Sequence, residues 1–304
     1  RALARVGDAY KLDKHTKRTF RPLASIAYDD RILSWNLKEP SVSIWTVAGR
    51  LSIPFVAGER QMQLLQTQMG ETDLVYQRGN WYLLATCDVH EPDPQDVDDV
   101  LGIDLGVTNI AVGSNGRIYS GSTVKSVRYR HRRLRNKLQK KGTLSAKRRL
   151  RKLSGQEARF AKDVNHTISK RIVREAQHTK RGIALENLKH IRTRVRVRKS
   201  QRTVLHSWSF AQLQAYIAYK AVLAGVPVAL VEPRNTSRTC PACGHVDKAN
   251  RKTQAAFKCV SCGCAGHADT IAAGNIRVLG RAAVMQPHVS EAAGRSCQGQ
   301  ADRL

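Results

Sequence analysis

The sequence lacks any apolar run of 18 residues, so no segment has the length and hydropathy of a membrane-spanning helix. Methionine is scarce: the 304 residues contain 3, and the first is Met62. The chain starts at Arg1, and no basic-then-apolar leader is visible there. We therefore expect a fragment, or the product of a start site that is not shown, and no membrane partner.

Acidic residues are also few, because 24 Asp and Glu oppose 52 Lys and Arg, for a net charge of +28. The excess is uneven: residues 1–124 hold 13 basic and 15 acidic side chains, residues 125–181 hold 21 and 3, and residues 182–304 hold 18 and 6. Such a charge predicts a polyanionic partner for the basic part, nucleic acid first of all. A membrane-surface patch or a solvated tail is the alternative, but apolar residues recur at helical spacing within the basic run.

The 7 cysteines do not form the dense framework of a small secreted protein, which favours an intracellular metal site. Four of them form two C-x-x-C pairs, namely Cys240, Cys243, Cys259 and Cys262. Four thiolates suit tetrahedral Zn²⁺ in a structural role, because no coordination position stays open for chemistry. Cys264 and His267 are close enough in sequence to be alternative ligands.

The N-terminal part predicts a small antiparallel sheet or barrel, because short β-branched and aromatic runs alternate with turn residues over residues 31–88. One helical stretch, residues 59–69, interrupts these runs. An acidic, proline-bearing stretch over residues 91–99 predicts a domain boundary. Beyond it, residues 100–119 predict a meander of three strands with Asp104 in the first.

The basic part predicts helices around a continued sheet. Glycine and threonine at 142–143 indicate a break between two helices, and apolar residues every four positions over 160–176 predict a third. An antiparallel helical pair with a basic outer face would follow a phosphate backbone. Further strands are predicted at 183–185 and 228–231, an arginine-rich loop at 189–202, and an amphipathic helix at 210–224.

Three acids occupy comparable positions: Asp104 in a strand, Glu186 at the end of a strand and Asp269 at the start of a helix. Each alone could cap a turn or a helix or end a strand in solvent. Together, in a basic protein, they predict a carboxylate cluster for Mg²⁺ (or Mn²⁺), where two ions would support phosphodiester cleavage. Without metal, the carboxylates would repel one another and at least one would tend to protonate.

Four motifs in order carry a resemblance to a known family. The segments GIDLGVTNIAVG, IALENL and HADTIAAGNI resemble the three motifs of a RuvC-type nuclease domain, and a zinc ribbon, TSRTCPACG…CVSCG, lies between the last two. This order is similar to that of TnpB (OrfB-type) proteins of insertion sequences, relatives of type V CRISPR effectors, over about residues 28–276. It implies an α/β fold: an RNase H-like mixed sheet with an inserted zinc ribbon, after a partial, antiparallel β-barrel-like wedge domain. The implied domains are 1–92 (wedge), 93–239 (RuvC-like), 240–264 (zinc ribbon), 265–278 (last RuvC-like helix) and 279–304 (disordered tail).

The resemblance also implies an RNA-guided, metal-dependent DNA endonuclease of an insertion sequence, using a two-metal mechanism. The residues at the family's catalytic, metal-binding positions are Asp104, Glu186 and Asp269. The four cysteines of the C-x-x-C pairs would bind structural zinc. The expected partners are a guide RNA from the element's edge, which reads the target by base pairing, and double-stranded target DNA. We expect a cytoplasmic, nucleoid-associated prokaryotic protein, and the sequence gives no oligomeric state.

Two departures from the family pattern define the alternatives. By the resemblance, we expect the front of the wedge domain and most of the helical recognition insert to be missing from the given sequence, and Ile271 stands where the family usually has Asn. A truncated or inactive RNA-guided DNA-binding protein, a repressor without cleavage, is therefore the second hypothesis. A DNA-strand transferase is the third, but the chain shows no obvious Tyr nucleophile with a paired-His metal motif.

Overall fold

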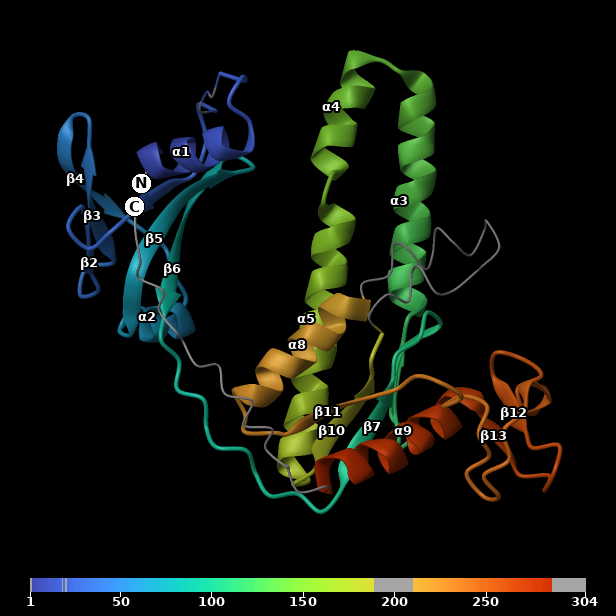
Figure 1. Ribbon diagram of the computed structural model, residues 1–304. Coiled ribbons are helices and arrows are strands. Elements are labelled where there is room, and N and C mark those ends of the chain that lie inside the picture. Colours follow the sequence, from blue (N-terminus) through green and yellow to red (C-terminus); the bar gives the residue numbers. More distant parts are fainter. Residues whose placement is uncertain (1, 18, 20, 189–209, 286–304) are drawn as a thin grey trace. The chain divides into compact units, whose positions relative to one another are not determined.

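A computed structural model gives the arrangement of the chain (Figure 1). It describes every residue except 1, 18, 20, 189–209 and 286–304. The chain divides into two compact units, Arg1–His90 and Glu91–Leu304. The arginine-rich loop predicted at 189–202 and most of the predicted tail lie outside the described residues. None of the helices in the described part is long and apolar enough to cross a bilayer.

The first unit contains two three-stranded antiparallel sheets, where the sequence predicts one small sheet or barrel. One sheet has the order β1 (Ile26–Tyr28), β5 (Gln68–Gln77) and β6 (Asn80–Cys87), and the other β2 (Leu33–Asn36), β3 (Ser41–Thr46) and β4 (Gly49–Pro54). A small core of Tyr28, Leu33, Val42 and Ile44 joins β1 to the second sheet. Two helices complete the unit, α1 (Ala2–Leu12) and α2 (Glu59–Leu65). The helix predicted at 59–69 is shorter than expected, because Gln68 already pairs with Cys87 in the first sheet.

The second unit is built on a mixed five-stranded sheet with the order β11-β10-β7-β8-β9. Its strands are β7 (Val100–Asp104), β8 (Asn109–Gly113), β9 (Ile118–Ser120), β10 (Gly182–Glu186) and β11 (Val228–Val231). The pairs β7–β10 and β10–β11 are parallel, whereas β7–β8 and β8–β9 are antiparallel. The predicted meander and the two later strands are therefore confirmed, and the fold is α/β.

Helices cover both faces of this sheet, α5 (Gln156–His178) and α8 (Phe210–Val222) on one and α9 (Ala268–Met285) on the other. Helices α3 (Ser122–Lys141) and α4 (Leu144–Leu153) form a hairpin that extends away from the sheet (Figure 1). Leu101 and Ile103 face a core that α5 and α8 complete, while Val100 and Ala184 face Ile276 of α9. This alternation follows the two-residue period of a strand. Because both faces are buried, the strands are continuously apolar in the sequence.

Helix α9 packs directly on the sheet, and this packing extends the helix beyond the end predicted from the sequence. A Cβ on Gly102 would come 2.2 Å from the Ala273 carbonyl oxygen, and one on Gly280 would come 2.2 Å from Ala184 Cβ. The sequence interpretation begins a disordered tail at residue 279, but α9 continues to Met285. The correction has a physical reason: glycine and alanine in this stretch permit close packing on β10, which keeps the segment helical.

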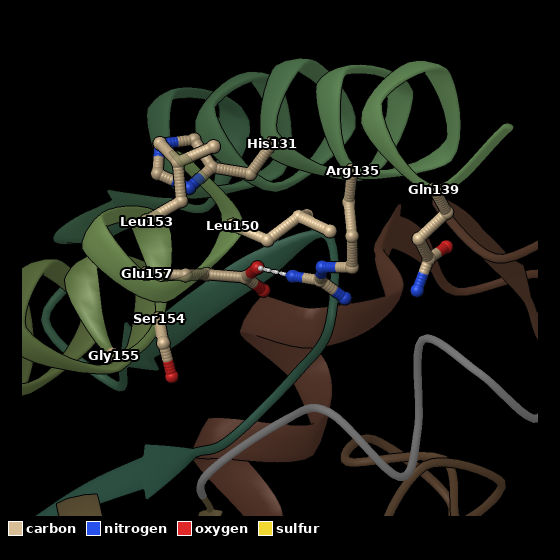
Figure 2. A pocket seen from close by; sticks show the side chains of 8 residues that line it. All are labelled: His131, Arg135, Gln139, Leu150, Leu153, Ser154, Gly155 and Glu157. Carbon is tan, nitrogen blue, oxygen red and sulfur yellow. Dashed lines mark hydrogen bonds and ion pairs between the residues drawn. The ribbon is translucent and has the colours of Figure 1, made fainter. Parts of the chain in front are cut away.

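The basic helices form a hairpin whose break is confirmed. Gly142 ends α3 in the left-handed region, at φ 64°, and the Thr143 hydroxyl accepts a hydrogen bond from the first turn of α4. Glu157 of α5 pairs with Arg135 at 3.1 Å (Figure 2). Its other carboxylate oxygen lies 3.5 Å from Arg128 Nε. A cavity of about 320 Å³ lies beside this contact. Exposed basic side chains cover the outer side of α3, namely Arg132, Arg133, Lys137 and Lys140.

Candidate functional site

The three predicted acids meet at one edge of the mixed sheet. Asp104 ends β7 and Glu186 ends β10, and these strands are parallel neighbours in which Leu185 pairs with Ile103. Asp269 is the second residue of α9, and its side chain accepts a hydrogen bond from Asn109 Nδ2 at 3.0 Å. Because β8 starts at Asn109 and returns along β7, this contact places Asp269 beside the end of β7.

Burial and like charge dominate the electrostatics of this edge. Burial raises the pKa of Asp104 to about 7, with the negative charges of Glu186 and Asp269 as further causes. Burial also raises the pKa of Glu186, while a hydrogen bond from the Thr236 hydroxyl to Glu186 Oε1 acts in the opposite direction. The repulsion expected from the sequence is therefore present in the structure.

Arg251 is the functional-site candidate that the sequence analysis missed. Its Nη2 lies 3.2 Å from Asp269 Oδ1, and its charge lowers the pKa of both Asp104 and Glu186. The residue belongs to the segment between the two cysteine pairs, where one arginine among many carries no distinguishing signal. Asn109 was detectable, since a hairpin that returns from Asp104 must bring its first residues back to the same edge.

The four cysteines form a much tighter group than the carboxylates. The ligand atoms of the four cysteines all lie within 4.8 Å of one another. Among the residues that the structure describes, no other group of three or more His, Cys, Asp or Glu side chains meets this distance. Cys240 Sγ is 3.5 Å from Cys262 Sγ, and Cys243 Sγ is 3.6 Å from Cys259 Sγ. Bonds to zinc of about 2.3 Å place tetrahedral sulfur atoms roughly 3.8 Å apart, so the cluster fits structural zinc. The alternatives Cys264 and His267 are not part of this group.

Backbone amides favour the thiolate form of two of the four cysteines. The N–H of Cys243, followed by that of Ala242, is directed at the Cys240 sulfur and lowers the pKa of that thiol to about 6. The amides of Cys262 and Ser261 lower the pKa of Cys259 in the same way. Zinc binds the thiolate, so amides that stabilise the thiolate favour the metal-bound form.

Ile271 lies in the apolar cluster of the cysteine ribbon. Cys240, Phe257, Cys259 and Ala268 form the buried part of that cluster, and Ile271 packs against it from the first turn of α9. The departure from the family pattern at position 271 therefore adds an apolar contact between the ribbon and the helix that carries Asp269.

Comparisons with known proteins agree with this architecture. The family model "Probable transposase" (OrfB_IS605) matches residues 84–192, and the model "Cas12f1-like, TNB domain" matches residues 210–276. The TnpB-like protein MJ0751 of Methanocaldococcus jannaschii is 32% identical over 198 residues, which are 60% of this chain and 70% of that protein. The CRISPR-associated endodeoxyribonuclease Cas12f1 of Syntrophomonas palmitatica is 30% identical over 222 residues, which are 67% of this chain and 44% of that protein.

A solved structure supports the fold. A Cas12f1–sgRNA–target DNA complex matches with a TM-score of 0.53 at 23% sequence identity, covering 73% of this chain and 48% of that one. The chain thus spans about half the length, or less, of the Cas12f1 proteins that it matches here. Given its similarity to MJ0751 over most of that protein's length, the chain belongs to the TnpB (OrfB-type) family of insertion-sequence proteins, relatives of the type V CRISPR effectors.

Proposed function

We propose that the chain acts as an RNA-guided, divalent-metal-dependent DNA endonuclease of an insertion sequence. The observation that carries this proposal is the meeting of Asp104, Glu186 and Asp269 at one sheet edge, where burial and mutual repulsion raise the pKa of Asp104. A group of acids that is strained without a cation is a good receptor for one. The family supplies the matching activity, since one relative is an endodeoxyribonuclease by name.

We assign the roles at this edge as follows. Asp104, Glu186 and Asp269 would hold Mg²⁺ or Mn²⁺, because these hard cations prefer carboxylate oxygens. When bound, two such ions supply an activated water and stabilise the leaving oxygen. Thr236 orients the Glu186 carboxylate, and Asn109 orients that of Asp269. The Arg251 guanidinium lies beside the acids and partly neutralises their charge. If bound metal neutralised the acids instead, this guanidinium would be free to bind a substrate phosphate.

The remaining parts have roles in binding. The exposed basic face of α3 suits the phosphate backbone of nucleic acid, and we assign guide RNA and double-stranded target DNA as the partners. We propose that the first unit is the partial wedge domain and that residues 240–264 form the zinc ribbon, which orients the start of α9.

The test uses the chain expressed with its native flanking DNA, so that any guide RNA co-purifies. Asp104→Asn should lower Mg²⁺-dependent cleavage of a matched target by about 10³-fold or more, because it removes a metal ligand at the reacting edge. RNA and target binding should change little. Asp163→Asn, which removes an exposed acid on α5, is the matched control and should cleave normally.

The same assay decides between the two family hypotheses. A chain that binds guide RNA and target but never cuts at any Mg²⁺ or Mn²⁺ concentration would be the RNA-guided binding protein instead. Cleavage that is equal in Asp104→Asn and in the wild type would contradict the assignment of the carboxylate edge.

A further inference from the structure

Besides the basic face of α3, the unit Glu91–Leu304 has a second basic site, on edge strand β9 and the last turns of α5. It is a cleft of about 730 Å³. Its lining includes Arg117 and Tyr119 from β9 and its turn, and Arg171, Arg174 and Glu175 from α5. This volume is sufficient for a nucleotide-sized ligand. None of these residues takes part in the carboxylate edge described above.

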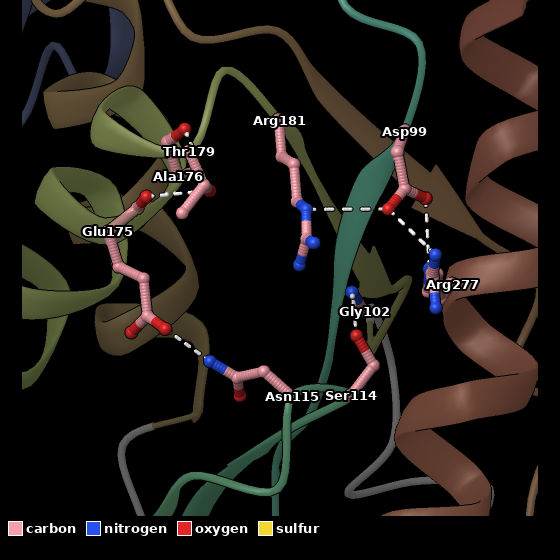
Figure 3. Close-up of polar contacts among 9 residues, drawn as sticks. All are labelled: Asp99, Gly102, Ser114, Asn115, Glu175, Ala176, Thr179, Arg181 and Arg277. Atoms are coloured by element: carbon pink, nitrogen blue, oxygen red, sulfur yellow. Dashed lines mark hydrogen bonds and ion pairs between the residues drawn. The ribbon is translucent and has the colours of Figure 1, made fainter.

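The cleft extends across two levels of the sheet. Helix α5 ends at His178, just before β10 begins, and the turn before Arg117 reaches back to Gly102, because the Ser114 amide donates to the Gly102 carbonyl oxygen at 2.8 Å. Figure 3 shows Ser114 beside Gly102 and Asn115 directed at Glu175 of α5. Strand β9 then returns toward the other end of the sheet, since Tyr119 pairs with Ala111, next to the Val112 that pairs with Asp104. The cleft therefore has its own set of residues, but it is not confined to the end of the sheet opposite the carboxylates.

The charge of the cleft is positive and only partly neutralised. Glu175 is its one acidic lining residue, and it is already engaged by Arg117, whose Nη1 lies 2.6 Å from Glu175 Oε2, and by Asn115 Nδ2. In the described part of the chain, no carboxylate lies within ion-pair distance of Arg171 or Arg174, and both side chains are exposed. The C-terminal end of a helix disfavours anions, so affinity must come from these arginines.

Tyr119 also lines the cleft, but its hydroxyl is buried and interacts with the Arg117 guanidinium. The exposed arginines, rather than this hydroxyl, are therefore the groups that a ligand in the cleft can reach.

We propose that this cleft binds a phosphate of a nucleic-acid backbone, so that the strand is anchored at a second point outside the carboxylate edge. Arg171 and Arg174 supply charge and paired N–H donors that match phosphate geometry. Arg117 is shared between the ligand and Glu175. The inference rests on the proposed function in one respect, that the physiological polyanion is nucleic acid.

The test compares two double variants of the full chain that lose the same charge from the same helix. Arg171→Gln/Arg174→Gln removes the free arginines of the cleft, whereas Lys162→Gln/Lys170→Gln removes exposed lysines outside it. Binding of a fluorescent single-stranded DNA of mixed sequence is measured by anisotropy across KCl concentrations. The arginine variant should reduce the slope of log K against log[KCl] by about 1.4, or about 0.7 for each lost phosphate contact. The lysine variant should keep the wild-type slope.

Two further probes identify the ligand. The same oligonucleotide with neutral methylphosphonate linkages should bind wild type and arginine variant alike. Equal slopes for the two variants would overturn the proposal. A second outcome would also overturn it: the DNA slopes stay equal, but inorganic phosphate at constant ionic strength raises the melting temperature of the wild type and not of the arginine variant. The site would then bind a small phosphate compound. A chain that shows the expected slopes but never cuts DNA would overturn the proposed nuclease and leave this site standing.

Discussion

The cysteine cluster and the carboxylate edge are both candidate metal sites, but the fold assembles them differently. The cysteines come from two short turns, and their sulfur atoms already lie at distances that suit zinc. The acids come from β7, β10 and α9, and packing buries Asp104 near the other two; burial first, and the negative charges of Glu186 and Asp269 second, raise the pKa of Asp104. Local sequence therefore makes the first site, whereas the packing of a helix on a sheet makes the second.

The largest effect is expected from disrupting the cysteine cluster. Cys240→Ser should abolish zinc binding and unfold the ribbon, since structural zinc contributes folding energy on the order of 10 kcal/mol. Cleavage should fall with it, because the ribbon is fastened to the start of α9 by a hydrogen bond from the Ala268 amide to the Ala255 carbonyl oxygen. Zinc content by mass spectrometry, the melting temperature and cleavage are the measurements.

Cys87→Ser is the control for this change, because Cys87 is a half-buried free thiol of β6 outside the cluster. It should keep both zinc and cleavage. A Cys240→Ser protein with full zinc content would show that another side chain, such as Cys264, replaces the lost ligand.

The carboxylate edge should instead be sensitive to the packing between α9 and β7. Gly102→Ala places a methyl group where the Ala273 carbonyl oxygen now lies, so α9 must move and carry Asp269 away from Asp104. We expect a loss of about 1–3 kcal/mol in the free energy of unfolding and a larger proportional loss of cleavage, with zinc content unchanged. Denaturant unfolding and cleavage rates on one preparation measure both.

Gly274→Ala is the matched control on the same helix, since a Cβ at this position meets nothing within 4 Å. It should stabilise the chain by about 0.5–1 kcal/mol, as alanine favours a helix over glycine. If the two glycine variants behaved alike, close contact between α9 and the sheet would not be what positions Asp269.

The contrast between the sites also explains what could be predicted from the sequence. Strands β7, β8 and β10 were predictable because continuous apolar runs mark strands buried on both faces, and the cysteine ligands because their spacing is local. The motifs predict Asp104, Glu186 and Asp269 as a set, and their role as metal-binding acids stays a prediction. Arg251 was not predictable, since its place beside the acids depends on how the ribbon folds back onto α9.

The ends of elements were the weakest part of the prediction. Helix α2 is shorter than its pattern because β5 competes for the same residues, and α9 is longer because Gly280 packs on Ala184. In both places a long-range contact overrides local preference. The two sheets of the first unit are a similar case, since strand runs alone do not determine which strands pair.

The smallest expected effect is a shift in pH dependence at the carboxylate edge. Arg251 lowers the pKa of Asp104, so Arg251→Gln should raise that pKa above about 7. A carboxyl whose pKa is raised in the folded state binds more protons than in the unfolded chain, so without added Mg²⁺ the stability should fall as pH rises from about 4 to 7. In Arg251→Gln this fall should extend to higher pH, and the acid limb of the cleavage profile should move to higher pH. Arg251→Lys keeps the charge and should shift both profiles less, whereas an unchanged midpoint in Arg251→Gln would mean that the guanidinium does not act on Asp104 in solution.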